Sequence, residues 1–578
     1  MGRMSAPALQ SSFMRLAAFI VAVSVALSIG PSAGPMVTIV NQLVAVLGWG
    51  LVLLLAPAPA PTWATLRAAG PLLAAVALAA TGCLASILFG HLPTPPGAAI
   101  LGVILFSGVV ASHGASAGAG ASDDWFLPFA IALVLAGVLG ACIACVQIFA
   151  VHLADNVWIA IPAAFGRAGG NIEQPNHFGD VLVWALIGLV ALAAHHARRH
   201  PGATLARAGI ACVALFVLLG VVLTGSRTAL VSLAMLAAWG LLDRQLERST
   251  RAALAVAPLL AIVLTTLVRT GTDAGLTARE GTDVTSFRLD IWSDTLSMIK
   301  AQPWTGVGWG QFNFAWTLTP FAWRPAGLVD NAHDLPLQLA AELGVPAAAT
   351  IFGLLLWSIW RPLRRVRGLA GVSGTTARCA LMIVLVIGLH SMLEYPLWYA
   401  YLLLPAAWAW GLLLGAGAVP VTAPASASSW RAWRAMGLLM GVAAVSAWAD
   451  YRNIVPLFVP TDASSTLGER IHDAQASPLF SYQADYVAIT SARPPPRMLP
   501  LVVRSSHVLL DGRMMYIWAN MLAARGENDK ARYLAARLRE FDLADAKPWY
   551  APCDNPSVAA KSFQCLPPDR PVDWRDFR

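Results

Sequence analysis

The chain has 578 residues, of which 57% are hydrophobic and only 12% are charged. Soluble proteins carry about 25% charged residues, so this composition excludes a soluble enzyme and indicates an integral membrane protein. The net charge of +8 does not indicate a nucleic-acid partner, because the basic residues mostly stand in short loops between apolar runs, where membrane topology explains them better.

Apolar runs of spanning length, or slightly less, predict an all-α polytopic membrane protein with about thirteen transmembrane helices. The first run lacks a convincing cleavage site and further spans follow, so we interpret it as a retained helix. The spans are expected near Leu16–Gly30, Met36–Leu55, Pro71–Phe89, Ala98–Ala111, Leu127–Val151, Phe178–Ala194, Ala208–Leu223, Ala229–Leu242, Ala252–Val268, Leu337–Trp360, Cys379–Leu393, Leu397–Gly417 and Ala435–Ala449.

Alternate loops are rich in arginine, and the positive-inside rule places such loops in the cytoplasm. A hydrophilic island, Arg269–Pro336, and a tail that begins at Asp450 then face outward. We therefore expect a polytopic domain over 1–449, with a periplasmic loop at about 269–336, and a periplasmic helical accessory domain over 450–578. The arginines that set this orientation are Arg67, Arg198, Arg199, Arg207, Arg244, Arg248, Arg251, Arg361, Arg364, Arg365, Arg367, Arg378, Arg431 and Arg434.

The first half of the island predicts an amphipathic helix from Phe287 to Lys300, lying on the membrane surface. Its apolar residues Leu289, Trp292, Leu296 and Ile299 recur at helical spacing, Thr285 or Ser286 is expected to cap its start, and Pro303 follows its end. Arg288 would then fall in the first turn, beside free backbone N–H groups that favour an anion. The alternative is that Arg288 belongs to the solvated face of a surface helix.

The second half of the island contains a turn-rich run, Pro303–Gly310, and the tetrad Asp330-Asn331-Ala332-His333. His333 is expected just before another helix, with Pro336 in an early position where a missing N–H costs little. The positive end of that helix would favour the neutral imidazole, which is the form that a general base requires. His333 is therefore a candidate base.

Three further polar clusters fall on the predicted outer face: the loop Gly166–His177, which contains Gln174 and Asn176, the turn Thr224–Arg227, and the turn His390–Pro396, which contains Glu394 and Tyr395. With the island they make four loops that are expected to converge, and His390 and Glu394 are expected on one helical face. The competing interpretations are that Gln174 and Asn176 only satisfy the backbone of a re-entrant loop, and that Arg227 only reaches the membrane interface.

These residue types suit chemistry at a phosphate leaving group. Two arginines bind a pyrophosphate through paired hydrogen bonds and stabilise the charge that develops on its departure. A neutral histidine removes the proton of an attacking hydroxyl. The sequence contains no D-x-D pair, H-E-x-x-H motif or P-loop, so nucleotide-sugar, zinc and ATP chemistry lack their usual ligands, and no cofactor or metal is expected.

The tail is more polar and predicts a helical hairpin, Met515–Arg525 and Asn528–Phe541, separated by Gly526 and similar to one tetratricopeptide unit. The run Arg493–Pro496 is expected to form a stiff linker before it. Cys553 and Cys565 both fall in the tail and could form a disulfide if the tail is exported, but the sequence does not decide whether they pair.

At these residues the sequence resembles the bacterial O-antigen ligase superfamily, specifically its protein O-oligosaccharyltransferase branch. Three segments carry the resemblance. They are Gly170-Asn171 with Gln174–His177; Thr224–Arg227 through Pro303–Gly308 to Asn331–His333; and Glu394–Tyr399. The middle segment is shared with lipopolysaccharide ligases, whereas the other two and the tail resemble the protein-modifying branch.

The resemblance implies transfer of a glycan, without metal, from undecaprenyl pyrophosphate to serine or threonine of periplasmic proteins such as pilin, at the inner membrane with the active site facing the periplasm. Arg227 and Arg288 match the pyrophosphate-handling arginines of the family, and His333 matches its essential histidine. Gln174 and Tyr395 match polar positions of the protein-modifying branch; with Asn176 and Glu394 they are expected to position the acceptor or the first sugar. Asp334 departs from the family, which commonly has Asn after the histidine.

Three alternatives stay open. An O-antigen ligase would use the same donor with lipid A-core as acceptor, and an O-antigen polymerase would share donor and topology without needing the tail. A polysaccharide or lipid transporter is a different class, expected to show inverted repeats and broken helices near mid-membrane. The polar clusters here lie at one predicted face and no repeat is visible, which counts against transport.

Overall fold

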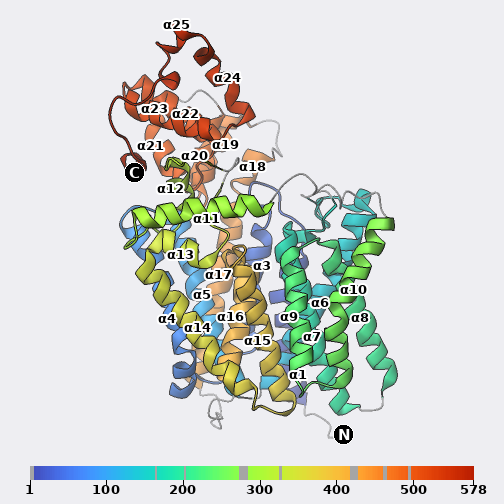
Figure 1. Cartoon of the computed structure of the whole chain (residues 1–578). Helices are drawn as coiled ribbons and strands as arrows, with labels where there is room; N and C mark the ends of the chain where they lie inside the picture. Colours follow the sequence, from blue (N-terminus) through green and yellow to red (C-terminus); the bar gives the residue numbers. More distant parts are fainter. Residues whose placement is uncertain are drawn as a thin grey trace. The chain divides into compact units, whose positions relative to one another are not determined.

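The computed structural model of the chain describes residues 6–120, 122–162, 166–200, 203–271, 284–324, 329–416, 427–459, 465–491 and 496–578. These residues form helices and connecting turns, and no strand occurs among them. The chain divides into two compact units. Unit 1 comprises 1–76, 105–282 and 353–448, and unit 2 comprises 77–104, 283–352 and 449–578. Figure 1 labels the helices of both.

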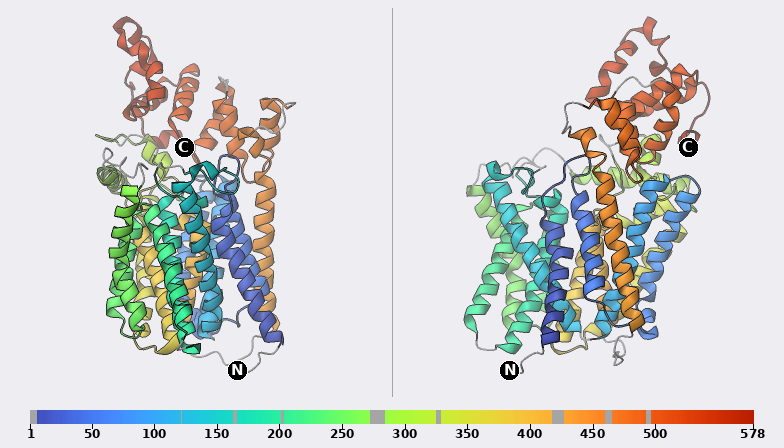
Figure 2. Two further views of the ribbon diagram at one scale, coloured as in Figure 1. Left: turned by 90° about the vertical axis from the view of Figure 1, so that its right-hand side faces the viewer. Right: turned by 180° about the vertical axis from the view of Figure 1, so that it is seen from behind.

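The helices of unit 1 run side by side (Figure 2). Four more, α4 (Trp63–Leu88), α5 (Thr94–Ala119), α14 (Val345–Val366) and α17 (Ala427–Tyr451), each begin in one unit and end in the other. The helices of unit 1 itself are α1 (Ala6–Phe19), the π-helix η1 (Ile20–Val25), α2 (Ala26–Ser28), α3 (Ile39–Leu55), α6 (Ser122–Phe149), α7 (Pro175–Arg199), α8 (Thr204–Leu223), α9 (Arg227–Leu242), α10 (Arg248–Gly271), α15 (Gly371–Ser391) and α16 (Ala400–Gly415).

The prediction of an all-α polytopic membrane protein is confirmed. Within the described part of the chain, nine helices are long and apolar enough to cross a membrane, and α3, α9 and α16 are shorter apolar helices. The count of about thirteen spans and the cytoplasmic or periplasmic side of each loop stay predictions.

One predicted span, near Leu337–Trp360, is wrong as a single helix. The structure has α13 (Leu335–Leu343) and then α14, which begins at Val345. Gly344 separates them with φ +82°, a left-handed conformation that favours glycine, and a Cβ there would lie 2.3 Å from the carbonyl oxygen of Trp304. Hydrophobic periodicity continues across this break, whereas Gly344 followed by Pro346 is a helix-end signal that the prediction of a single span did not use.

Close helix packing in unit 1 depends on small residues. On α16, a Cβ added to Gly411 would lie 1.9 Å from the carbonyl oxygen of Ala111 on α5, and a Cβ on Gly114 of α5 would lie 2.2 Å from the carbonyl oxygen of Trp408. Small residues allow membrane helices to approach in this way. Beside this contact the Trp408 ring packs 5.0 Å from that of Phe19.

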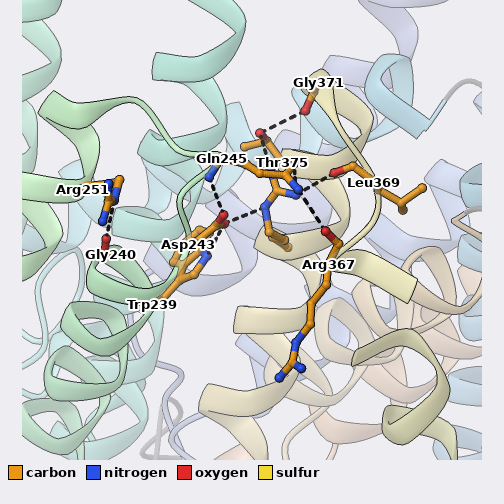
Figure 3. A network of polar contacts seen from close by, with 10 residues as sticks. Trp239, Gly240, Asp243, Gln245, Arg251, Arg367, Leu369, Gly371 and Thr375 are labelled. Atoms are coloured by element: carbon orange, nitrogen blue, oxygen red, sulfur yellow. Dashed lines mark hydrogen bonds and ion pairs between the residues drawn. The ribbon is translucent and has the colours of Figure 1, made fainter. Parts of the chain in front are cut away.

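The arginine-rich loops at one end of unit 1 are held by local contacts (Figure 3). Arg378 pairs with Asp243 at 2.7 Å and donates to the carbonyl of Leu369 at 2.9 Å. Arg251 donates to the carbonyls of Gly240 and Leu241, both at 3.0 Å. Cations at helix C-terminal carbonyls are stabilised by the helix dipole. Part of the arginine bias therefore has a structural cause in addition to topology.

Unit 2 joins the hydrophilic island to the tail around one hydrophobic core. From the island come α11 (Val284–Ala301), α12 (Phe312–Leu318) and α13. Figure 1 shows α12 beside the helices of the tail. Buried residues of this core include Phe312 and Trp316 from the island and Met514 and Trp518 from the tail. The helices of the tail are α18 (Val455–Phe458), α19 (Leu467–Gln475), α20 (Ser481–Thr490), α21 (Leu499–Ser506), α22 (Gly512–Ala524), α23 (Asn528–Glu540), α24 (Lys547–Tyr550) and α25 (Pro556–Ala559).

Polar contacts also hold the tail to the island within unit 2. Tyr533 donates to the carbonyl of Leu318 at 2.7 Å, and the buried Arg324 pairs with Glu540 at 3.2 Å. The sequence predicted an accessory domain over 450–578 as a separate piece. That boundary stays a prediction, whereas the shared core and these bonds group the tail with the island.

One prediction for the tail is confirmed, and one point that the sequence left open is answered. Helices α22 and α23 form the expected hairpin, with Gly526 between them at φ +81°. Cys553 and Cys565 are joined in a disulfide. The predicted linker Arg493–Pro496 lies outside the described residues except for Pro496, which begins a short 3-10 helix.

Candidate active site

In unit 1, the loop before α7 is bound to the ends of two neighbouring helices. Gln147 of α6 accepts hydrogen bonds from the N–H groups of Gly169 (3.1 Å) and Gly170 (2.9 Å). The N–H of Ala168 donates to the carbonyl of Leu223, the last residue of α8, at 2.9 Å. Irregular backbone is tolerated in membrane proteins only where its polar groups find protein partners or water, and these bonds supply such partners.

Gln174 is the N-cap of α7. Its Oε1 accepts from the N–H groups of Asn176 (2.5 Å) and His177 (2.9 Å), and Pro175 occupies the first position, where no N–H is needed. Of the two interpretations of this side chain, the one in which it satisfies the local backbone is therefore realised. A further role in positioning an acceptor or sugar stays a prediction.

Asn176 connects three of the predicted loops. Its Oδ1 accepts from the hydroxyl of Ser226 (2.9 Å) and from Nη2 of Arg167 (3.3 Å), and its Nδ2 donates to Oε1 of the buried Glu394 (3.1 Å). The expected convergence is thus confirmed for these three loops. The fourth predicted loop is the island, which belongs to unit 2.

Arg227 is the first residue of α9 and its side chain is exposed. The turn before it is fixed by Ser226, whose Oγ accepts from the N–H of Ala229 (3.2 Å), and by Arg167, whose Nε donates to the carbonyl of Thr224 (3.0 Å). A cation at the exposed start of a helix, next to a turn that is fixed in this way, is well placed to meet an anion from outside the bundle.

Glu394 and His390 do not share a helical face, so that prediction is wrong. Helix α15 ends at Ser391, and Glu394 lies in the turn that follows, where its N–H donates to the carbonyl of His390 (2.9 Å). The two side chains have different partners. Glu394 accepts from Asn176, whereas Nδ1 of His390 lies 2.5 Å from Oδ2 of Asp180.

The pair Asp180–His390 was missed in the sequence analysis. Both side chains are fully buried, and the ring of His177, also fully buried, lies 5.4 Å from that of His390. Asp180 is the only charged residue of the predicted span Phe178–Ala194, near its start, and an ionisable residue within a span is a functional candidate by default. That signal was available in the sequence.

Aromatic rings surround His177 on the side of the Glu394 turn. Its ring lies 4.7 Å from that of Tyr399 and 6.1 Å from that of Tyr395, and the two tyrosine rings are 5.9 Å apart. Tyr395 is half-buried. Polar and aromatic side chains of α7 and of the segment 394–401 therefore form one continuous cluster.

In unit 2, His333 occupies a turn held from three sides. It has φ +52°, a left-handed conformation, and its N–H donates to Oδ1 of Asn331 (2.9 Å). The N–H of Ala332 donates to Oε1 of Gln338 (2.8 Å) and its carbonyl accepts from the indole of Trp292 (2.9 Å). A non-glycine residue at positive φ is strained, and such strain clusters at functional sites.

The expected helix start after His333 is confirmed. Asp334 is the N-cap of α13, its Oδ1 accepts from the N–H of Leu337 (2.8 Å), and Pro336 is the second helical residue. Burial raises the pKa of the Asp334 carboxyl, and the hydrogen bond from Leu337 opposes that shift. The departure from Asn at this position therefore still provides a good cap.

The helix predicted for Phe287–Lys300 exists but begins earlier. Because α11 starts at Val284, Thr285 and Ser286 lie inside it rather than capping it, and both capping predictions are wrong. Arg288 then falls in the second turn, where backbone N–H groups already have partners, so the anion site at a helix start is wrong as well. Arg288 is one turn before Trp292 and so shares its face of the helix, the face that contacts Ala332.

The apolar stripe of α11 is divided between two environments. Ile299 is buried in unit 2, whereas Leu289 and Leu296 are 55% and 46% exposed. Exposed leucines on one face suit contact with a membrane surface, and that contact stays a prediction.

Buried Glu342 ties α13 to the turn-rich run at 303–310. Its carboxylate accepts from the N–H of Phe312 (3.2 Å) and its carbonyl accepts from the N–H of Gly308 (2.9 Å). A Cβ on Gly306, which has φ +64°, would lie 2.4 Å from the carbonyl carbon of Glu342. Burial raises the pKa of Glu342 to about 7. This run is therefore structural support for α13 and for the His333 turn before it.

Comparison with known proteins gives two family matches. Residues 211–352 match the family described as O-antigen ligase, and residues 379–551 match the family described as virulence factor membrane-bound polymerase, C-terminal. Residues 211–352 are thus similar to the O-antigen ligase family. The resemblance inferred from the sequence motifs is thereby confirmed.

One curated relative is also similar. The chain is 32% identical over 127 residues to the general O-oligosaccharyltransferase of Acinetobacter baylyi (strain ATCC 33305 / BD413 / ADP1). The matched segment spans 22% of this chain and 21% of that relative, so it covers only about a fifth of each.

The superfamily matches divide the candidate residues into two groups. The O-antigen ligase segment contains Arg227, Arg288 and His333, whereas the second segment contains Glu394 and Tyr395 together with most of the tail. Gln174 and Asn176 lie before both matched segments. The hydrogen bond between Asn176 and Glu394 nevertheless places the loop before α7 against the second one.

Proposed function

We propose that the chain is an oligosaccharyltransferase that moves a glycan en bloc from undecaprenyl pyrophosphate to serine or threonine hydroxyls of periplasmic proteins, pilin being one example. The observation that carries this proposal is that a single O-antigen ligase match, 211–352, contains Arg227, Arg288 and His333. The name of the Acinetobacter relative, an O-oligosaccharyltransferase, supports a protein acceptor.

In the proposed reaction, His333 removes the proton of the acceptor hydroxyl while that oxygen attacks the anomeric carbon of the first sugar. The bond between the anomeric carbon and the pyrophosphate oxygen breaks, and its electron pair leaves with the lipid pyrophosphate. Arg227 and Arg288 stabilise the charge that develops there. The strained, triply held turn at His333 supports this role, because a base acts best when its position is fixed beforehand.

We assign the choice of acceptor to the cluster in unit 1. Asn176, Glu394 and Tyr395 combine hydrogen-bonding groups with an aromatic face, and Gln174 fixes the loop that carries Asn176. Such a combination suits a hydroxyl-bearing peptide segment or the first sugar of the donor.

We place the enzyme in the inner membrane with this cluster facing the periplasm. Within unit 1 the arginine-rich loops gather at one end of the helices, where Gln245 at the start of α10 donates to the carbonyl of Arg367 after α14 (3.0 Å; Figure 3). The candidate residues of unit 1 lie at the opposite helix ends, because α7 begins where α8 ends. The positive-inside rule then assigns the arginine-rich end to the cytoplasm.

Two alternatives use the same donor. The O-antigen ligase match favours a lipid A-core acceptor, and the description of the second family as a polymerase favours growth of the glycan itself. Only the acceptor differs between them, so the acceptor is what an experiment must identify.

The test is expression in a strain that makes the lipid-linked glycan but cannot itself transfer it either to lipid A-core or to proteins. We expect glycan on periplasmic proteins, detected by intact-protein mass. Glycan on lipid A-core alone would establish the ligase alternative, and longer lipid-linked chains alone would establish the polymerase.

Variants then separate the roles of the residues. His333→Ala should reduce transfer by about a hundred- to ten-thousandfold while donor binding persists, whereas Arg227→Ala and Arg288→Ala should weaken donor binding as well. Lysine should rescue either arginine only in part, because a point charge does not reproduce the planar guanidinium. The matched control is His472→Ala, an exposed histidine of α19 in the same unit; near-normal transfer by well-folded His333→Ala would refute the proposed base.

A further inference from the structure

Unit 2 contains a cavity of about 530 Å³ that the proposed reaction does not use. One wall is a single face of α11, formed by residues such as Asp290, Asp294 and Ser297, which recur at helical spacing. By that spacing, Arg288 and Trp292 belong to the opposite face of α11. The other walls are the segment after α12, with Phe321 and Trp323, and the C-terminal 3-10 helix η9 (Trp574–Phe577).

Asp294 is the most informative residue of the cavity. The residue is only 7% exposed, its Oδ2 is fully covered, and the indole of Trp316 acts on the carboxylate as a hydrogen-bond donor of poor geometry. The nearby Arg324 is committed elsewhere, because its guanidinium bonds to Glu540 and to the carbonyl of Trp316. Burial raises the pKa of Asp294 to about 6, against opposing effects of Arg324 and Trp316. A carboxylate accepts more hydrogen bonds than one such donor supplies, and a ligand in the cavity would add them.

The cavity also presents aromatic faces at its mouth. The indole of Trp323 is 58% exposed and Phe321 is half-buried. Deeper in the wall, Trp574 is buried and is covered on one side by the guanidinium of Arg578, 4.5 Å from its ring centre. An exposed indole at the mouth of a cavity presents a flat apolar face against which a ring-shaped ligand packs. Asp290, on the same wall as Asp294, adds a second carboxylate.

The residues that line the cavity indicate which class of ligand it binds. The lining carries two carboxylates and one cation, Arg575, which already pairs with Asp573 at 2.6 Å. Hydroxyl or amino groups of a ligand would supply hydrogen bonds to the two carboxylates. Aromatic rings bury the apolar face of a ring-shaped ligand. The volume falls in the range of sites for small ligands, about 300–1,000 Å³.

We propose that this cavity is a saccharide-binding subsite, in which Asp290 and Asp294 accept hydrogen bonds from the hydroxyl or amino groups of a sugar and Trp323 and Phe321 pack against its ring. The inference that the cavity binds a saccharide depends only on the residues that line it. The further inference that this saccharide is part of the transferred glycan rests on the proposed function. That glycan would be bound either as the lipid-linked donor or as the glycosylated product.

The test is binding by the purified full-length protein in detergent. The probes are glucosamine, N-acetylglucosamine, galactose and the free oligosaccharide released from the lipid-linked donor by mild acid. We expect wild type to bind at least one of them. Trp323→Ala should weaken that binding by about three- to tenfold, the effect of losing one aromatic contact, and Asp294→Asn by about tenfold, the effect of losing a charged hydrogen bond.

Two controls make the result specific. Trp304→Ala, which removes a 77% exposed indole of the same unit outside the cavity, should bind as wild type does. His333→Ala should also retain saccharide binding while losing transfer. A wild-type protein that binds saccharide but transfers none would refute the proposed function and leave the subsite standing. Competition by lipid-linked donor or by glycosylated product then identifies the source of the sugar.

Three results would overturn the proposal. They are binding of none of the saccharides by folded wild type, saccharide binding that neither Trp323→Ala nor Asp294→Asn alters, and cavity-dependent binding of an unglycosylated serine- or threonine-bearing peptide in place of saccharide. The last result would assign the cavity to the acceptor.

Discussion

Asn176 and Glu394 are 218 positions apart in the chain, yet Nδ2 of Asn176 donates to Oε1 of Glu394 at 3.1 Å. This bond joins the start of α7 to the turn after α15. It also fixes the orientation of the Asn176 side-chain amide, because Nδ2 faces Glu394 while Oδ1 accepts from Ser226 and Arg167. Substitutions can therefore separate the donor role of Asn176 from its acceptor role.

We expect Asn176→Asp to be more damaging than Glu394→Gln. The aspartate still accepts from Ser226 and Arg167, but it removes the donor to Glu394 and places a second carboxylate beside it. Losing a buried hydrogen bond to a charged group costs about 1.5–3 kcal/mol. The double variant should recover part of the loss, because the new glutamine at 394 can donate to the aspartate. Thermal unfolding and transfer of each variant measure this coupling, and a double variant no better than Asn176→Asp would show that the bond has no role.

The buried carboxyl of Glu342 predicts a pH dependence of stability. Its pKa is raised from 4.5 to about 7 in the folded protein, so the folded state binds a proton that the unfolded state has lost. The stabilisation is complete below about pH 4.5, is lost as the pH rises to about 7, and is absent above that. A shift of this size corresponds to about 3 kcal/mol.

The measurement is the unfolding temperature of wild type and of Glu342→Gln between pH 4.5 and 8. Glutamine keeps an acceptor for the N–H of Phe312 but does not titrate. We expect the difference between the two proteins to change across this range in favour of the variant at high pH. Parallel curves would show that Glu342 does not titrate there. The titration of Asp294 affects the stability of both proteins equally, so it does not contribute to the difference between them.

The sequence predicted most of the helices but not where they are interrupted. Apolar runs located the helices because a helix that crosses the membrane must be apolar over a length set by the membrane's thickness. The interruption at Gly344 carries no hydrophobic signal, since it depends on a backbone contact with Trp304 that is distant in sequence. Likewise, the early start of α11 at Val284 moved Arg288 out of the first turn, because capping patterns locate helix ends only to within a few residues.

Site residues were predictable where they stood in an unusual local pattern, as Asn176, Arg227 and His333 do. Their partners were harder to predict. Glu394 pairs with Asn176 rather than aligning with His390, and His390 pairs with Asp180. Such pairings are decided by tertiary packing between helices that are far apart in the chain, which helical periodicity within one segment does not report.

The disulfide between Cys553 and Cys565 gives an independent test of topology. It forms only if the tail reaches an oxidising compartment, so its presence in cells reports export. We expect both thiols to resist alkylation in intact cells until a reductant is added. The control is the same cells treated with reductant first, in which Cys553 and Cys565 should both react. Alkylation of Cys553 and Cys565 without reductant would contradict a periplasmic tail.

The contacts between island and tail predict that the tail stabilises the segment that carries His333. Arg324 of the island is buried, and its partner Glu540 belongs to α23. Arg324→Met would leave the carboxyl of Glu540 with Arg537, at 2.8 Å, as its remaining partner. Breaking a buried pair costs about 3–5 kcal/mol when the remaining charge is left unpaired. We expect a smaller loss, because Glu540 keeps Arg537 and is 22% exposed, but a loss larger than that of a surface pair, because Arg324 also donates to the carbonyl of Trp316.

The matched control is Arg532→Met. Arg532 also lies on α23 and pairs with Asp569 at 2.6 Å, but that aspartate is 77% exposed, and a surface pair contributes at most about 1 kcal/mol. Limited proteolysis of the purified protein measures the effect on the island directly. Arg324→Met should be cleaved within residues 284–343 much faster than wild type, and Arg532→Met at nearly the wild-type rate. Truncation after Val459 should accelerate cleavage still more, because it uncovers the core around Phe312 and Trp316. An island that resists protease equally well in all three proteins would show that the tail is an addition to an independently stable site.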